Sequence, residues 1–567
     1  MPSPSDPSPK HPRHAAPLGD FTAGPRTIAI TLLALVVGVL AAYLAKALLA
    51  LIAFFTNLFF FQRLSLATVT PASHHLGVLS VLVPVVGCLV IGILARYGSE
   101  KIRGHGIPEA LEAILIRGSR IEPRVALLKP ISSAISIGSG GPFGAEGPII
   151  MTGGAFGSMI AQLFHLTAAE RKTLLVAGAA AGMSATFASP VAAVLLSVEL
   201  LLFELKPRSL VPVALASAAA AVVRRYILGS GPLFPVPDVD IAAATAPMIL
   251  FSCTFVGLAA GMLSAALTAA VYAAEDAFGK LKLHWMWWPA LGGLVVGVGG
   301  LICPQALGVG YDQIQALLLG GAGVAMTLRL MLVKATIWSV SLGSGTSGGV
   351  LAPLLMMGSA LGVLEAHFLP AHGTGFWPIV SMGAILAGTM RAPLTAMIFA
   401  IELSGRFGLA LPILTAGMVA HLFTVLVLRR SILTEKVARR GFHLTREYSI
   451  DPLEILFVRE VMLHEAVVLP LDRAVAAVVA HGDEPLRAAV HRMAETGLTQ
   501  LPVVDRSEPT RLIGLLTLKE ALTARIRHLE EEGRRERVLP LSGMIPFARF
   551  RRRGAVADKP QPDRKAV

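Results

Sequence analysis

Charged residues are scarce in this sequence. Asp, Glu, Lys and Arg make up 15% of its 567 residues, whereas they make up about a quarter of an average soluble domain. Hydrophobic residues account for 54%, and the mean hydropathy is +0.68. Apolar runs recur from about position 27 to position 428. This composition excludes a soluble globular protein and predicts a polytopic membrane protein.

Cysteine and acidic residues are also few. Cys88, Cys253 and Cys303 all lie in apolar segments, which favours small buried residues over a disulfide framework. Basic residues outnumber acidic ones, and the formal net charge is +13. Many of the basic residues flank apolar segments or lie near the chain ends, as in the Lys/Arg excess of cytoplasmic loops. We prefer this topological role to nucleic-acid binding, and we expect an inner-membrane protein with both termini in the cytoplasm.

Signatures of intramembrane catalysis are missing from the apolar region. It contains neither an HExxH sequence nor a pair of aspartates suited to hydrolysis. We therefore do not expect an enzyme. A soluble sensor with a membrane anchor is a further class to consider, but an anchor needs neither an internal repeat nor a buried acid.

Residues 138–157 form the most unusual part of the apolar region. Their sequence, GSGGPFGAEGPIIMTGGAFG, is too rich in glycine for an ordinary helix and contains one carboxylate, Glu146. Backbone that is not helical at membrane depth must be buried in protein or line a cavity. An acidic residue at such a place is a candidate functional group.

The same stretch recurs later in the chain. Residues 343–362, GSGTSGGVLAPLLMMGSALG, align with 138–157 without a gap at an offset of 205 residues. Residues 188–200 align with 391–403 at nearly the same offset. The membrane region therefore consists of two homologous halves, and matched broken helices predict a binding site at their interface. The residues alone leave open whether the halves are parallel or inverted.

Composition also divides the chain into domains. Apolar runs stop near position 451, and an amphipathic helical pattern then alternates with short β-type runs, which predicts a small α/β module. The two ends are rich in proline, serine or basic residues, which predicts disordered tails. We assign 1–26 to a cytoplasmic tail, 27–450 to the transmembrane domain (halves about 27–230 and 240–450), 451–540 to the α/β domain and 541–567 to a basic tail.

Three Gly-rich turns could bind an anion. GHGIP (104–108), GAEGP (144–148) and GGVLAP (348–353) each end in a proline suited to a helix start. Backbone amides at a helix N-terminus bind anions, because they are unpaired and lie at the positive end of the helix dipole. If the three turns converge, Glu146 would compete with the anion for the same amides. Its carboxylate would then act as a plug that protonation releases.

These motifs together resemble those of the CLC family of chloride channels and chloride/proton exchangers. GHGIP is similar to the family's G-S-G-I-P, GAEGP to G-[RK]-E-G-P, and GVLAP to G-x-F-x-P. The resemblance covers about 27–450 and implies an all-α inverted repeat with broken helices, assembled as a homodimer with one pore per subunit. Residues 458–535 resemble a cytoplasmic CBS regulatory region, with a clear second repeat and VREVM (458–462) as the start of a degenerate first one.

The resemblance also implies roles for single residues. Glu146 takes the place of the gating glutamate, and Lys129 that of a buried lysine near the anion path. Glu199 belongs to a segment that looks like the family's F-x-x-P…E helix. The implied anion-binding residues are His105, Gly106 and Ile107 of the first motif, Val350 and Leu351 of the third, and a central tyrosine for which we choose Tyr448.

Four positions depart from the family pattern. His105 replaces a serine that contacts the anion, Ala145 replaces a basic residue, and Leu351 replaces a phenylalanine. Leu200 stands where proton-coupled members often have an inner glutamate. We therefore favour a chloride channel, or an uncoupled or atypically coupled transporter, over a chloride/proton exchanger. The alternative is an antiporter for chloride and protons, or a transporter of another anion such as nitrate or fluoride.

The CBS-like region could bind an adenine nucleotide. GLLTLKEA resembles the G-x-x-T-x-x-D pattern, with Thr517 kept and Glu520 in the aspartate place. Because one repeat is degenerate, we favour a dimerisation or coupling role over nucleotide binding. The expected partners are a small inorganic anion, the lipid membrane and a second copy of the chain, with no nucleic acid and no resident cofactor.

Overall fold

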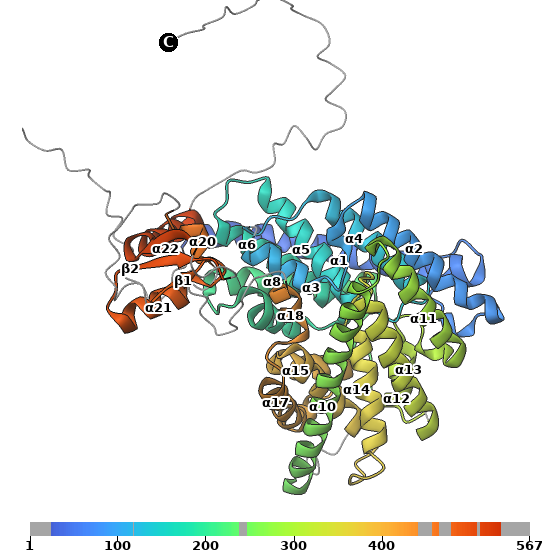
Figure 1. The fold of residues 1–567 in the computed structure, drawn as a ribbon. Coiled ribbons are helices and arrows are strands. Elements are labelled where there is room, and N and C mark those ends of the chain that lie inside the picture. Colours follow the sequence, from blue (N-terminus) through green and yellow to red (C-terminus); the bar gives the residue numbers. More distant parts are fainter. Residues whose placement is uncertain are drawn as a thin grey trace, which may run out of the picture.

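A computed structural model shows a helical region followed by a small α/β module (Figure 1). The first half of the repeat, drawn from blue to green, lies beside the second half, drawn from green to brown. This arrangement agrees with the predicted all-α membrane region and α/β module. The structure describes residues 24–116, 118–237, 246–321, 323–439, 456–463, 478–506 and 511–533.

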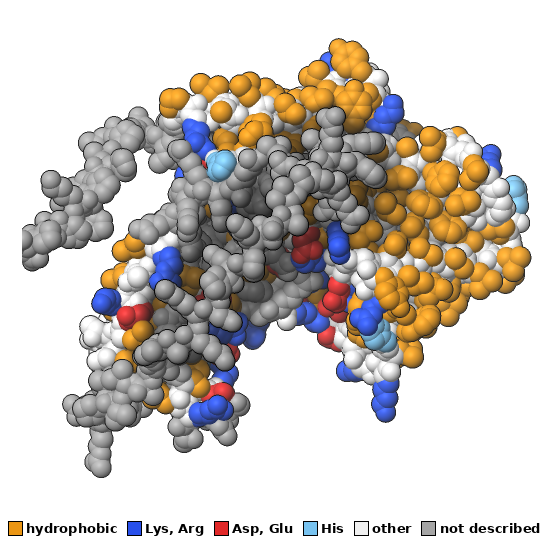
Figure 2. All heavy atoms as spheres, turned by 90° about the horizontal axis from the view of Figure 1, so that it is seen from above, with side chains coloured by type: hydrophobic (Ala, Val, Ile, Leu, Met, Phe, Trp, Pro, Cys, Tyr) orange, Lys and Arg blue, Asp and Glu red, His pale blue; other side chains and the backbone are white. Residues whose placement is uncertain are grey.

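Seven helices within the described ranges are long and apolar enough to cross a membrane. Their outward side chains are apolar, and Figure 2 shows a broad hydrophobic face with charged side chains along its edge. The spans are α1 (Arg26–Phe61), Gly77–Tyr97 with α2 (Leu82–Tyr97), α8 (Pro207–Ile227), α10 (Pro247–Gly279), Trp285–Ile302 with α11 (Trp288–Ile302), α13 (Val324–Gly343), and Phe407–Arg439 with α17 (Ala410–Val427) and α18 (Ile432–Arg439).

The other membrane-region helices are mostly shorter and more deeply buried. Small residues allow them to pack closely, as lipid-embedded helices commonly do. A Cβ atom at Gly153, for example, would lie 2.2 Å from the carbonyl oxygen of Gly178 on the neighbouring helix. They are α3 (Ile107–Leu115), α4 (Pro123–Gly138), α5 (Glu146–Gln162), α6 (Ala168–Phe187), α7 (Pro190–Leu196), α12 (Tyr311–Leu318), α14 (Leu351–Glu365), α15 (Phe376–Met390) and α16 (Pro393–Ser404).

Two matched glutamates join the halves of the repeat. Glu199 of the first half accepts hydrogen bonds from the amide (2.8 Å) and hydroxyl (2.5 Å) of Thr395, in the first turn of α16. Glu402 of the second half accepts hydrogen bonds from the amides of Val191 (3.0 Å) and Ala192 (2.8 Å), in the first turn of α7. Each half therefore caps a helix N-terminus of the other, which gives Glu199 a structural role.

Replacing Glu199 with Gln is expected to lower stability without changing how anion transport depends on pH. Charge-assisted hydrogen bonds at a helix N-terminus contribute on the order of 1–2 kcal/mol, and the amide side chain retains only part of that. The measurement is the thermal midpoint of the purified protein in detergent, with Glu402→Gln as the matched variant. An unchanged midpoint with an altered pH dependence would instead make Glu199 part of the transport chemistry.

The α/β module contains a mixed sheet. Strand β1 (Ala480–His481) pairs in parallel with β2 (Gln500–Val504), and β2 pairs antiparallel with β3 (Leu512–Thr517). Helices α20 (Val458–Val461), α21 (Leu486–Thr496) and α22 (Leu518–Gly533) complete the described part of the domain, and α22 packs against α6.

The start of this module corrects a prediction. Val458 and Met462 of the VREVM segment share one hydrophobic core with Leu501 and Val503 of β2. Leu463 exchanges two backbone hydrogen bonds with Leu515 of β3, at 2.9 and 3.1 Å. VREVM is therefore the first segment of a single domain and not the remnant of a separate repeat. Its short run of residues carried too little pattern to distinguish these two alternatives.

Candidate functional site

The three Gly-rich turns meet at the boundary between the halves. Gly144 and Gly349 exchange backbone hydrogen bonds, with N–O distances of 3.3 and 2.9 Å. The amide of Gly348 also donates to the carbonyl of Gly104 at 3.4 Å. Helices α3, α5 and α14 consequently begin around a common point, although they come from distant parts of the sequence.

Glycine is required where these turns touch. A Cβ atom at Gly147 would lie 1.9 Å from the carbonyl oxygen of His105. A Cβ atom at Gly349 would lie 2.4 Å from Oε1 of Glu146. Gly106 has a φ of +92°, which L side chains rarely adopt, and a Cβ there would lie 2.5 Å from the Gly147 carbonyl oxygen. The glycines therefore allow backbone and carboxylate to approach where no side chain fits.

Glu146 lies on the amides at the start of α14. Its side chain is fully buried, and Oε1 accepts hydrogen bonds from the backbone amides of Leu351 (2.5 Å) and Ala352 (3.2 Å). The other oxygen, Oε2, is buried and has no hydrogen-bond partner within the described part of the chain. Since these amides lie at the positive end of α14, the carboxylate occupies a position suited to a small anion.

Two pairings in the structure involve residues predicted to contact the anion. The amide of Gly106 donates to Oε2 of Glu109 at 2.8 Å, so that it is not available to an anion. In the third motif, Glu146 accepts hydrogen bonds from the amides of Leu351 and Ala352, whereas the amides predicted for the anion are those of Val350 and Leu351. The sequence could not reveal either difference, because both depend on which donors neighbouring side chains already occupy.

The buried lysine supports the first turn. Lys129 on α4 is fully buried, and its ammonium donates to the carbonyl oxygens of Ile102 (2.8 Å) and Gly104 (2.6 Å). It therefore fixes the loop that leads into α3. Glu109, one turn into α3, also accepts a hydrogen bond from Lys436 of α18 at 2.7 Å, which ties α18 to the same turn.

A second buried lysine occupies the matching place in the other half. Lys334 on α13 is fully buried and donates to the carbonyl oxygens of Ala306 (2.9 Å) and Gly308 (2.8 Å), just before α12. It stands at the repeat offset from Lys129. Our sequence reasoning missed Lys334, although extending the alignment of the halves from position 138 back to 129 would have found it.

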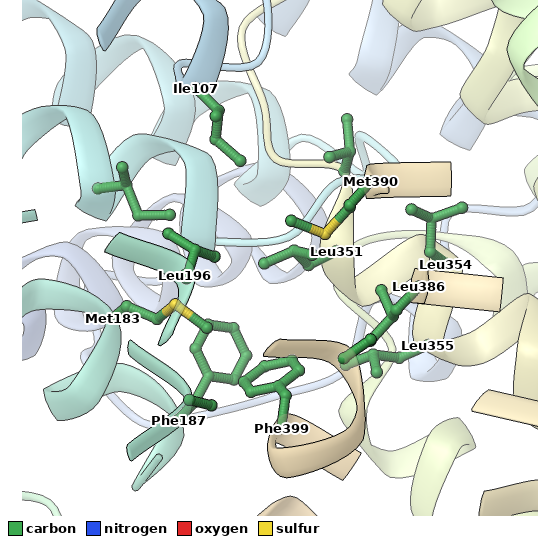
Figure 3. Packing of buried hydrophobic residues seen from close by; sticks show 14 of the residues in the cluster. Ile107, Met183, Phe187, Leu196, Leu351, Leu354, Leu355, Leu386, Met390 and Phe399 are labelled. Atoms are coloured by element: carbon green, nitrogen blue, oxygen red, sulfur yellow. The ribbon is translucent and has the colours of Figure 1, made fainter. Parts of the chain in front are cut away.

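Apolar side chains from several helices pack together with Ile107 and Leu351 of the Gly-rich turns. Figure 3 shows Ile107 of α3, Leu351 of α14 and Met390 of α15 near one another, with Leu196 of α7 in the same cluster. Leu200 itself is fully buried in a π-helical turn, Ser197–Leu202, that continues α7. Leu200, for which the resemblance implies the place of an inner glutamate in proton-coupled members, is therefore enclosed by packed side chains.

The remaining predicted site residues lie in the first turn, in the α/β module or outside the described residues. His105 and Ile107 are buried within the first turn, at 3% and 0% exposure. Tyr448, our choice for the central tyrosine, lies outside the described residues. In the α/β module, the Thr517 hydroxyl accepts a hydrogen bond from the Glu520 amide at 3.4 Å and thus caps α22.

Comparisons with known proteins agree with this geometry. The model of the family described as voltage gated chloride channel matches residues 86–425, more than half of the chain, and the CBS domain model matches residues 458–527. A ClcB-like chloride channel protein from Ralstonia nicotianae is 29% identical over 351 residues, which cover 60% of this chain and 81% of the relative. An H(+)/Cl(-) exchange transporter, ClcA, from Salmonella schwarzengrund is 30% identical over 367 residues, which cover 61% and 74%. A solved structure of a slow cyanobacterial Cl-/H+ antiporter aligns with a TM-score of 0.64 at 23% identity over 74% of this chain and 99% of that one, which confirms the predicted fold.

Proposed function

Because the chain belongs to the voltage gated chloride channel family, we propose that it carries chloride or a similar small anion through a pathway gated by Glu146. One observation carries the proposal: the buried carboxylate of Glu146 accepts the hydrogen bonds of two α14 amides. An anion can use these amides only after the carboxylate leaves them. Protonation weakens the hold of the amides on Glu146, so that acid opens the pathway.

The pathway works as a channel or as an uncoupled or atypically coupled transporter. Leu200 and the apolar cluster around Leu196 and Met390 support this choice, since none of these side chains can carry a proton inward from Glu146. The second candidate is proton-coupled chloride exchange. It is favoured by the relatives that are named H(+)/Cl(-) exchange transporters.

The anion is chloride or an ion of similar size. Backbone amides bind small anions without a fixed counter-charge, which allows the ion to leave again. His105 in the first turn replaces the hydroxyl found in the family motif, and this replacement supports nitrate or fluoride as alternative cargo. No resident cofactor is needed for this chemistry, because the chain's own amides and Glu146 supply the binding groups and the gate.

The chain acts as a multi-pass protein of the inner membrane. Both termini face the cytoplasm in this proposal, which places the CBS domain on that side, where its helix α22 packs against α6. A homodimer with one pathway per subunit is the expected assembly. The CBS domain contributes to dimerisation or coupling, since Thr517 serves as a helix cap in place of a nucleotide contact.

Anion efflux from proteoliposomes tests the proposal. Purified full-length protein is reconstituted into liposomes that contain potassium chloride. A potassium ionophore is then added so that potassium efflux balances the charge, and external chloride and pH are recorded together. We expect chloride efflux with little or no proton uptake, and none from protein-free liposomes. Proton uptake in a fixed ratio to chloride would establish the exchange alternative. Absence of flux for chloride, nitrate and fluoride alike would contradict the proposal.

A further inference from the structure

Helix α12 is the second-half counterpart of α3, the helix that begins at the end of the first Gly-rich turn. α3 begins at Ile107 after Gly106, with a φ of +92°, and α12 begins at Tyr311 after Gly310, with a φ of +76°. The loops before both helices are held by matched lysines, Lys129 and Lys334, as described above. Matching the helix starts, with one residue fewer than the repeat offset, therefore makes Tyr311 the counterpart of Ile107 in the first turn.

The hydroxyl of Tyr311 is buried but has no hydrogen-bond partner in the described ranges. The ring is held edge-on against Phe187, with 6.3 Å between centroids, and against Phe234, with 5.7 Å. Phe187 lies beside Phe399 in the apolar cluster that also contains Leu351 (Figure 3). Buried hydroxyl groups are normally paired, because an unpaired one costs free energy. An unpaired donor near a side chain that moves can take that side chain as its partner in another state of the protein.

Glu146 can supply that partner. Its Oε2 is buried and accepts no hydrogen bond from the residues that the structure describes, and the Tyr311 hydroxyl and Glu146 are close enough to interact electrostatically. Lys334 of α13 also interacts with Glu146, and Asp312 of α12 interacts with Lys334. The ammonium of Lys334 already donates to two carbonyl groups, whereas the Tyr311 hydroxyl has no hydrogen-bond partner in the described ranges.

We propose that Tyr311 receives the carboxylate of Glu146 when this side chain leaves the α14 amides. The phenol then donates a hydrogen bond to the displaced carboxylate, and the Leu351 and Ala352 amides become available to the passing anion. Tyr311 is thus a positioning residue that stabilises the open state of the gate. This inference rests on the proposed function, because it requires Glu146 to be the gate.

The test is a double-mutant cycle of Tyr311→Phe and Glu146→Ala in full-length protein. Chloride efflux is measured across a pH series for the wild type, both single variants and the double variant. We expect Tyr311→Phe alone to slow efflux by about tenfold, as loss of a hydrogen bond to a charged group implies. It should also shift the pH profile of efflux. In the Glu146→Ala background the same substitution should have no effect. Tyr226→Phe, on an exposed tyrosine of α8, is the matched control.

Two outcomes would overturn the inference. Tyr311→Phe could leave the rate and the pH profile at the wild-type values, or it could slow efflux equally with and without Glu146. The thermal midpoint provides a second readout, since a purely structural hydroxyl would lower it when removed, whereas an unpaired one would not. If instead the wild type carried no anion, or Glu146→Ala behaved as the wild type, the proposed function itself would fail.

Discussion

Glu146→Gln is expected to raise chloride efflux at neutral pH by about tenfold or more and to remove its dependence on pH. The carboxylate of Glu146 accepts hydrogen bonds from the Leu351 and Ala352 amides, and hydrogen bonds to a charged group contribute about 1.5–3 kcal/mol. A neutral amide side chain competes less well with chloride for these donors. It also cannot titrate, so the variant should resemble the wild type at low pH across the whole range.

The control for this prediction is Glu402→Gln. Glu402 also accepts hydrogen bonds from two amides at a helix N-terminus, those of Val191 and Ala192. These amides begin α7, which does not follow any of the three Gly-rich turns. We expect its substitution to leave the pH profile of efflux unchanged. Efflux from Glu146→Gln that still rises with acid, as in the wild type, would show that another group is the gate.

Gly147→Ala is expected to reduce anion efflux to about a tenth or less of the wild-type rate. The new methyl group would lie 1.9 Å from the His105 carbonyl oxygen and 3.2 Å from Cα of Gly349, so that the three turns must separate. Overpacking of this kind costs about 1–3 kcal/mol, and the displaced turns no longer present their amides together. Initial efflux rates at equal protein density measure the effect.

The matched control is Gly279→Ala at the end of α10. A Cβ atom at Gly279 would meet nothing within 4 Å, and the substitution changes the same residue type in the same way. We expect wild-type efflux from this variant. Normal efflux from Gly147→Ala, with a normal thermal midpoint, would mean that close contact between the first two turns is not needed for transport.

The architecture could be predicted from the sequence because the membrane region contains an internal repeat. The gapless alignment of 138–157 with 343–362 identified two halves, and each Gly-rich turn ended in a proline that marks a helix start. The structure brings these turns together around Glu146. Lys334 and Tyr311 were missed: Lys334 follows from extending the gapless alignment, whereas Tyr311 corresponds to Ile107 only when the starts of α12 and α3 are matched.

The pairing of individual amides could not be predicted in this way. The Gly106 amide is occupied by Glu109, whose carboxylate folds back over one turn of α3. Lys129, which the resemblance placed near the anion path, donates to the backbone carbonyls of Ile102 and Gly104. Such details depend on three-dimensional competition among donors and acceptors. A family motif therefore locates the site without fixing which of its atoms are available.

The most direct test is the position of bromide in an experimental structure of Glu146→Gln. Bromide substitutes for chloride and can be located by its anomalous scattering. Our account predicts a bromide ion within hydrogen-bond distance of the Leu351 and Ala352 amides, where the wild-type carboxylate lies. A bromide ion bound elsewhere along the pathway, with the glutamine still on these amides and efflux undiminished, would contradict it.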